Sequence, residues 1–274
     1  MNIQKAVIVG GTNGLGRSIA HWLVSRGVSV TVVGRTFRDE ETDHLNFLEA
    51  DLSVVSEQHR IGAELPVEDI GLLVFTVGIL SPKLRETSID GVEIDLAVSY
   101  LSRFVILRSV ADKLGANLRS RARVFVMGAP GSNIGGNPND LNSEQSYSQF
   151  AAHAQTIAAN EALVLDAVAR YPEIDVYGLA PGLVATGAIR APFLGGVNSL
   201  RFKIVEWLIS KFSHSADEYA NRIGPMLIGS ALEASSGSIF DSKARRKEPS
   251  QKLTPERVSE IIKATEELLR TLPR

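Results

Sequence analysis

The sequence predicts an α/β protein built on a doubly wound parallel sheet. Short runs rich in β-branched residues alternate along the chain with longer helical stretches. The short runs are continuously apolar, which is typical of strands covered on both faces. Because such strands alternate with helices, we expect helices on both faces of one sheet. The expected strands lie in the runs KAVIVG, VSVTVVG, GLLVFTVG, ARVFVMG and EIDVYGLAP.

The helices are expected between these runs. Gly27 is a stop signal for the first helix. Ser215 with Glu218 has the pattern of a capping box, and Thr254 before Pro255 is typical of a helix start. The expected helices include 15–26, 90–113, 147–170 and a C-terminal helix at 254–270.

Three further segments bear on a ligand site or on subunit pairing. The loop 128–146 is dense in Gly, Pro, Asn and Ser and follows a strand end, so it is expected to border a ligand crevice. The segment 187–214 is unusually apolar; it either caps a pocket or packs as a helix on the core, and we take it as a substrate-side insertion. The alanine-rich stretch 147–170 permits close approach of another helix, from a second subunit or from the same chain.

Length and composition fit one domain. The 274 residues are 44% hydrophobic and 22% charged, which is ordinary for a globular protein with a substantial core. No internal repeat or linker divides the sequence, so we expect a single domain over 1–274.

The charge balance and residue inventory exclude several functions. With 29 basic and 31 acidic residues, a net charge of -2 gives no reason to expect nucleic acid or an anionic membrane as partner. The first apolar run is short and leads into glycines, unlike a membrane span. Because there is no cysteine, thiolate catalysis, zinc–thiolate sites and iron–sulfur clusters are excluded. We expect no metal site and a cytoplasmic location.

The turn after the first strand predicts a bound nucleotide. Gly10 permits a tight turn, Gly14 lets a pyrophosphate approach, and Gly16 permits close helix packing. The start of the following helix supplies N–H donors and partial positive charge. The expected contacts are Gly10, Thr12, Asn13, Gly14, Leu15 and Gly16.

The residues at the end of the second strand indicate which nicotinamide nucleotide the protein binds. A NAD-binding protein would place an acidic residue near Arg35 and Thr36 to receive the adenosine 2'-hydroxyl. An arginine cannot accept that hydrogen bond, but its guanidinium binds a 2'-phosphate through charge-assisted bonds. The sequence therefore favours NADP(H) over NAD(H); the alternative is that Arg35 is a solvated loop charge.

The GxxxGxG spacing and three later motifs resemble the short-chain dehydrogenase/reductase family over nearly the whole chain. Asp51-Leu52 resembles the pair that contacts adenine. Val77-Gly78 resembles the end of the family's Asn-Asn-Ala-Gly motif, although Phe75 and Thr76 replace both asparagines. The run PGLVAT at 181–186 resembles the segment that holds the nicotinamide carboxamide. The resemblance implies further cofactor contacts at Asp51, Leu52, Val77, Gly78, Pro181, Gly182, Val184 and Thr186.

The pattern is closest to the retinol-dehydrogenase-like branch of that family, on residues such as DGVE at 90–93 and SGSIF at 236–240. The resemblance implies a Rossmann-type sheet of about seven strands and hydride transfer between NADP(H) and an alcohol or carbonyl. It also implies a homodimer or homotetramer. The expected substrate is a small, apolar molecule.

The resemblance also shows that the usual catalytic residues are missing. In such enzymes an asparagine orders a water and a serine holds the substrate oxygen. The asparagine position falls on Ser99, and the serine position falls on Gly128 or Ala129. Losing several such groups would disable the usual mechanism.

The usual proton donor is a tyrosine whose pKa is lowered by a lysine, and it can be placed in two registers. One register puts the tyrosine position at His153 and the lysine position at Ile157; the other puts them at Tyr147 and Ala151. Neither contains a lysine, and none occurs from 117 to 201. Tyr147 and His153 are therefore the candidate catalytic residues, and a histidine titrates near neutrality on its own.

Three hypotheses follow. The first is an NADP(H)-dependent oxidoreductase with an atypical catalytic site. The second is an NADP(H)-binding sensor or structural partner without redox turnover. The third is non-redox catalysis in an apolar pocket near Phe202 and Trp207. Arg103 stands at an unusual position for the family, and a helix-face salt bridge is its expected role.

Overall fold

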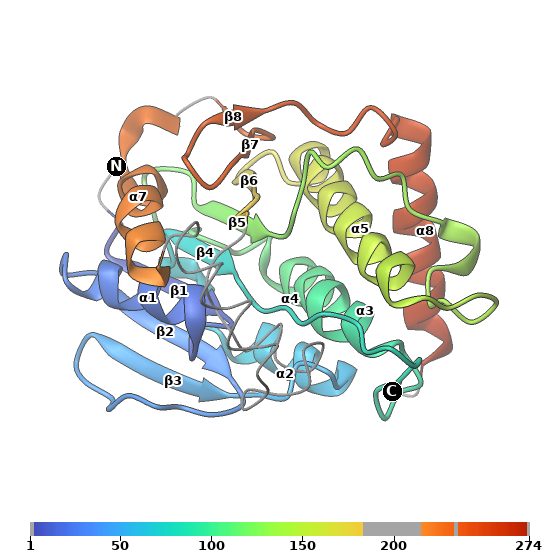
Figure 1. The fold of residues 1–274 in the computed structure, drawn as a ribbon. Coiled ribbons are helices and arrows are strands. Elements are labelled where there is room, and N and C mark those ends of the chain that lie inside the picture. Colours follow the sequence, from blue (N-terminus) through green and yellow to red (C-terminus); the bar gives the residue numbers. More distant parts are fainter. Residues whose placement is uncertain (1–2, 183–214, 233–234, 273–274) are drawn as a thin grey trace.

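The computed structural model describes residues 3–182, 215–232 and 235–272. Within these residues eight strands form one sheet, in the order β3-β2-β1-β4-β5-β6-β7-β8 (Figure 1). All neighbouring strands are parallel except β7 and β8, which pair antiparallel. The predicted doubly wound parallel sheet is confirmed, with a short antiparallel strand added at one edge. The strands are β1 (Lys5–Val9), β2 (Ser29–Gly34), β3 (Leu45–Glu49), β4 (Leu72–Phe75), β5 (Arg123–Met127), β6 (Asp175–Leu179), β7 (Ile239–Phe240) and β8 (Arg246–Lys247).

Helices cover both faces of the sheet (Figure 1). On one face, α1 and α7 pack together over a core that includes Ile19, Leu23 and Ile223. On the other face, α2, α4, α5 and α8 cover a second apolar core. The helices are α1 (Gly14–Val24), α2 (Val55–Glu64), α3 (Ile94–Leu96), α4 (Ser102–Val110), α5 (Gln149–Arg170), α7 (Ala216–Ile228) and α8 (Pro255–Thr271).

The capping patterns in the sequence that predicted where helices begin and end agree with the structure. Gly27 takes a left-handed conformation with φ of 78° just past α1. Ser215 and Glu218 make both bonds of a capping box at the start of α7. The Thr254 side chain accepts from the N–H of Arg257 and caps α8, which confirms the expected C-terminal helix.

The expected helix 90–113 was wrong as a continuous α-helix. Its first residues form a turn in which Gly91 has φ of 83°, α3 is short, and a π-helical turn over Ala97–Leu101 separates α3 from α4. A π-helical turn widens the helix by one residue and is often found at functional sites. Here it carries Ser99, which lies between Asp95 and Arg103 along the helix.

The expected helix 147–170 begins two residues later than predicted. Ser148 is extended, and its hydroxyl accepts from the N–H of Ala151, so α5 starts at Gln149. Tyr147 therefore lies before the helix. The helix that packs against the alanine-rich α5 is α8 of the same chain. Ile261 and Ile262 of α8 share a core with Ala159 and Ala162 of α5.

No helix in the described ranges is long and apolar enough to cross a membrane. The segment 187–214, expected as a substrate-side insertion, lies outside the described residues, as do Phe202 and Trp207.

Candidate functional site

The glycine turn joins the carboxyl end of β1 to α1. Gly10 and Gly14 both have positive φ, at 93° and 52°. An ideal Cβ on Gly10 would lie 2.4 Å from the Val77 backbone nitrogen, and one on Gly16 would lie 2.3 Å from the Gly10 carbonyl oxygen. These positions admit only glycine because the turn packs directly against the chain leaving β4.

The start of α1 is suited to an anion. Asn13 caps the helix by accepting from the Gly14 N–H, and the first turn contains no acidic side chain. The remaining N–H groups and the positive end of the helix dipole are the features that hold a pyrophosphate. Leu15 packs beside the core under α1, and Thr12 packs over Gly34, where an ideal Cβ would lie 2.6 Å from the Thr12 hydroxyl oxygen.

The loop after β2 exposes two arginines. Arg35, Thr36 and Arg38 are exposed. Neither arginine makes a hydrogen bond or ion pair with another residue of the described ranges. The nearby Asp39 carboxylate does not compete for them, because it is bound by Arg17, whose hydrogen bonds hold the pKa of Asp39 below its usual range. Sequence reasoning missed Arg38, which the short spacing from Arg35 could have revealed.

The adenine-side residues lie at the adjacent strand ends. Asp51 is exposed after β3, and its carboxylate accepts from the Ser53 N–H at 3.0 Å and hydroxyl at 2.8 Å. Leu52 is buried under the loop. After β4, the Val77 N–H donates to the Val9 carbonyl at 2.9 Å, and Gly78 follows.

The segment after β6 is described only in part. Pro181 and Gly182 follow the strand, and Gly182 is exposed with φ of 69°. Val184 and Thr186 lie outside the described residues. Those predicted cofactor contacts that the structure describes all follow carboxyl ends of parallel strands, which is where ligands bind in open α/β sheets.

Tyr147 bonds to the loop after β4. Its hydroxyl donates to the Pro82 carbonyl at 2.5 Å, and the neighbouring Gln149 amide donates to the Ser81 carbonyl at 2.7 Å. Burial, and after it the charges of Glu93 and Asp95, raises the pKa of Tyr147. Since Tyr147 precedes the Ser148 cap, Ala151 is not one helical turn beyond it.

His153 lies on α5 in contact with a buried carboxylate. Its Nδ1 is 2.8 Å from an Asp95 carboxylate oxygen, and the Asp95 side chain has no exposed surface. A carboxylate accepts hydrogen bonds, so we assign the Nδ1 proton to this bond and leave Nε2 available for chemistry. The imidazole is one-third exposed, which gives it access to solvent.

Asp95 is the functional candidate that sequence reasoning missed. Besides His153, it accepts hydrogen bonds from the hydroxyls of Ser81 and Ser99. Ser99 also accepts from the Ile79 N–H at 2.9 Å. These bonds hold the carboxylate in one orientation, and through it the imidazole. The spacing of Asp95 and Ser99 by four residues was a weak sequence signal; nothing near Asp95 in the sequence indicated its contact with His153.

Arg103 differs from its expected role. Its side chain is buried on α4 with 3% of its surface exposed, and in the described ranges it makes no ion pair. One guanidinium nitrogen, Nη2, donates to the Val77 carbonyl. Burial lowers the pKa of Arg103 to about 9, and the charge of Asp95 acts against this. The physical reason for the difference is that Arg103 lies at a buried position of α4, whereas Arg108 of the same helix is the arginine that reaches carboxylates near the surface.

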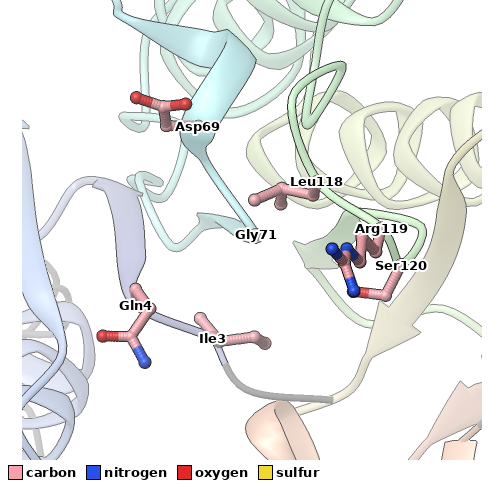
Figure 2. A pocket seen from close by; sticks show the side chains of 7 residues that line it. All are labelled: Ile3, Gln4, Asp69, Gly71, Leu118, Arg119 and Ser120. Atoms are coloured by element: carbon pink, nitrogen blue, oxygen red, sulfur yellow. The ribbon is translucent and has the colours of Figure 1, made fainter.

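One surface hollow lies away from these residues. It has a volume of about 330 Å³ and is lined by residues that precede β1, β4 and β5, at the amino end of the sheet. Figure 2 shows that its polar side chains, Gln4, Asp69 and Arg119, do not gather around one point. A second hollow of about 220 Å³ lies between the loop after β5 and α5, lined in part by Ile134, Asn137 and Gln155. Neither contains His153 or Asp95.

Comparisons with known proteins agree on one family. The family model described as short chain dehydrogenase matches residues 4–192. An uncharacterized oxidoreductase of Saccharomyces cerevisiae is 45% identical over 272 residues, covering 97% of this chain and 87% of that protein. Retinol dehydrogenase 12 of Homo sapiens is 25% identical over 264 residues, covering 89% of this chain and 80% of that protein. The crystal structure of an NADH-dependent reductase complexed with NAD has a TM-score of 0.62 at 16% identity, covering 89% of this chain and 96% of that one.

Proposed function

The chain belongs to the short-chain dehydrogenase family, and from that premise we propose that it is an NADP(H)-dependent oxidoreductase whose proton donor is His153. The observation that carries the proposal is the contact of 2.8 Å between His153 Nδ1 and the buried Asp95 carboxylate. It supplies an oriented acid and base on α5, beside the loops that follow the carboxyl ends of β4 and β5. In the register with the lysine position at Ile157, His153 takes the place of the tyrosine.

The cofactor-binding residues fit a dinucleotide. The glycine turn and the start of α1 hold the pyrophosphate, Arg35 and Thr36 hold the 2'-phosphate, and Asp51 and Leu52 border the adenine. The two unpaired arginines of the loop after β2 support NADP(H), because a 2'-phosphate supplies the anion that they lack. Toward the nicotinamide we place Val77, Gly78, Pro181, Gly182, Val184 and Thr186.

The division of labour in the reaction follows from this arrangement. The bound cofactor supplies or accepts the hydride. In the direction of reduction, the C–H bond forms as the carbonyl π bond breaks, the π electron pair moves to the substrate oxygen, and His153 Nε2–H then donates its proton to that oxygen. In the reverse direction the same nitrogen accepts the alcohol proton. Asp95 stabilises the charged imidazole and fixes its tautomer, and solvent returns the proton through the exposed part of the ring.

We propose an apolar carbonyl or alcohol as substrate. Leu84 and Phe150 are 79% and 85% exposed. They lie on two segments joined by the bonds from Tyr147 to Pro82 and from Gln149 to Ser81, and Phe150 is close in sequence to His153. Retinol dehydrogenase 12, by its name, acts on an apolar alcohol, which supports the same class.

The test is NADPH consumption with a panel of apolar aldehydes and ketones, and NADP⁺ reduction with the matching alcohols. His153→Gln keeps a polar side chain of similar size but cannot transfer the proton. We expect it to lower kcat by ~10²- to 10⁴-fold, the usual worth of a general acid. Affinity for NADP⁺, measured by calorimetry, should stay near that of the wild type.

Tyr147→Phe is the matched control, because it removes a hydroxyl that is already bonded to Pro82. We expect its kcat to stay within a few-fold of the wild type. Asp95→Asn should lower kcat by at least about tenfold through loss of the imidazole orientation, while NADP⁺ affinity stays unchanged. Full activity of His153→Gln, or loss of activity in Tyr147→Phe alone, would reject His153 and favour Tyr147.

A second candidate is an NADP(H)-binding protein without redox turnover. It is favoured by the absence of a lysine in either register and by the bond that occupies the Tyr147 hydroxyl. Binding of NADPH without turnover of any substrate in the panel would support it. Turnover of any panel member that depends on His153 would exclude it.

A further inference from the structure

The buried Arg103 guanidinium has free hydrogen-bond donors. Nη2 donates to the Val77 carbonyl, but Nε and Nη1 have no hydrogen-bond partner in the described part of the chain. A buried donor without a partner costs about 1–3 kcal/mol, and more when it is charged. An arginine left in this state is typical of a site whose acceptor arrives with a ligand.

Asp95 is not that acceptor, because no hydrogen bond joins it to Nε or Nη1 of Arg103. It is the charged group that stabilises the Arg103 cation, but its two oxygens already accept from Ser81, Ser99 and His153. The pKa of Arg103, lowered by burial to about 9, still leaves the guanidinium charged at neutral pH. The missing partner is therefore an oxygen that carries, or develops, negative charge.

The free donors lie at the strand ends that border the ligand crevice. An ideal Cβ on Gly128 would be 3.7 Å from Arg103 Nη1, and one on Gly78 would be 3.6 Å from Nη2. Gly128 directly follows β5, and Gly78 lies just beyond β4, the neighbouring strand. Neither residue has a side chain, so no Cβ of Gly78 or Gly128 lies between the guanidinium and these strand ends.

Arg103 also belongs to the side-chain cluster that holds the proton donor. Ser99 donates a hydrogen bond to Asp95. An ideal Cβ on Gly78 would lie 3.5 Å from the Ser99 hydroxyl oxygen and 3.6 Å from Arg103 Nη2, so Arg103 lies together with this pair. His153 joins this cluster through Asp95. A cationic donor and an acid–base group thus belong to the same cluster.

We propose that Arg103 Nη1–H donates a hydrogen bond to the reacting oxygen of the substrate and stabilises its negative charge before His153 supplies the proton. The inference rests on the proposed function. It deepens that function by assigning the group that holds the substrate oxygen, in a chain whose Gly128 provides no hydroxyl. In the reaction this bond strengthens as the carbonyl oxygen becomes an alkoxide, and it weakens once the O–H bond has formed.

The first test does not depend on turnover. Full-length protein labelled with [¹⁵N]arginine is titrated with formate in the presence of NADP⁺, and the Nε–H resonances are followed by NMR. We expect the Arg103 resonance to shift saturably. The Arg123 resonance is the internal control, because Arg123 Nε is also buried without a partner but lies at the amino end of β5. Arg103→Lys and Arg123→Lys assign the two signals.

The second test uses the best carbonyl substrate of the panel. Arg103→Met should lower kcat by ~10²-fold or more with little change in KM, as expected for a donor that acts mainly in the transition state. Arg103→Lys keeps the charge and should restore part of the loss. Should the methionine variant fail to fold, the lysine variant carries the comparison, with a kcat below that of the wild type.

The two tests separate the two ideas. If formate leaves the Arg103 resonance unchanged, or shifts it no more than the Arg123 resonance, the Arg103 site is overturned, whether or not the protein turns over substrate. A kcat within twofold of the wild type in folded Arg103→Met does the same. If the wild type turns over no substrate of the panel but its Arg103 resonance shifts with formate, the proposed oxidoreductase is overturned and the anion site stands.

Discussion

Arg35 is the residue on which cofactor choice is expected to depend. It is exposed after β2 and, in the described ranges, has no partner of opposite charge. Arg35→Ala should raise the dissociation constant for NADP⁺ by roughly 10- to 100-fold, the worth of one charge-assisted hydrogen bond lost, and leave that for NAD⁺ unchanged. Calorimetric titration of both nucleotides measures the difference.

The matched control for that prediction is Arg119→Ala. Arg119 is also an exposed arginine, but it lines the hollow at the amino end of the sheet (Figure 2). Its loss changes net charge by the same amount and should leave both affinities unchanged. Equal weakening of NADP⁺ and NAD⁺ by Arg35→Ala would contradict a 2'-phosphate contact.

Residues with local signals were predictable, and residues defined by tertiary contacts were not. The glycines of the turn and the caps at Ser215 and Thr254 depend on neighbours a few positions away, so their patterns are visible in the sequence. His153 and Asp95 are 58 positions apart, and only the packing of α5 against α3 brings them together. Arg103 was misread for a related reason, because one sequence does not show which positions of a helix are buried.

Helix boundaries show the same limit. The alanine-rich composition predicted α5, but the Ser148 cap begins it two residues later than expected and separates Tyr147 from the helix. The prediction of helix 90–113 missed the π-helical turn over Ala97–Leu101, since no residue type marks such a turn. That turn matters because it lies in the segment that carries Asp95, Ser99 and Arg103.

Packing between α1 and α7 depends on one glycine. An ideal Cβ on Gly224 would lie 2.4 Å from the Trp22 indole ring. Gly224→Ala should therefore lower the free energy of unfolding by about 1–3 kcal/mol, the usual cost of overpacking, although alanine favours a helix by about 1 kcal/mol. Urea denaturation measures the change.

A double variant identifies the cause. Trp22→Leu removes the ring atoms that the new methyl group would meet, so adding Gly224→Ala to it should cost less than in the wild type. A stability unchanged or raised by Gly224→Ala alone would show that the two helices separate without cost.

In the molecule as a whole, α8 completes the layer formed by α4 and α5 (Figure 1). The Tyr100 hydroxyl on the preceding π-helical turn is 2.7 Å from Thr265 of α8, and both residues are fully buried. At the edge of this layer, Arg108 of α4 pairs with Asp166 of α5 at 3.1 Å and with Glu266 of α8 at 3.5 Å. The C-terminal helix is thus part of the core.

This arrangement bears on assembly. A homodimer or homotetramer stays a prediction, but the covered face of α5 is not free to form it, so any pairing has to use another surface. The helix that carries the proposed proton donor His153, α5, is packed within its own chain.

Because α5 and α8 belong to one chain, α8 does not dissociate from α5 when the protein is diluted. Where a neighbouring subunit supports an active site, activity per molecule falls once the protein concentration drops below the dissociation constant of the pair. Here the support of α5 is intramolecular, so turnover per molecule should stay constant from micromolar to nanomolar enzyme. Initial rates over a dilution series, with inert carrier protein to prevent surface loss, measure this; a progressive fall would show that a second chain is needed.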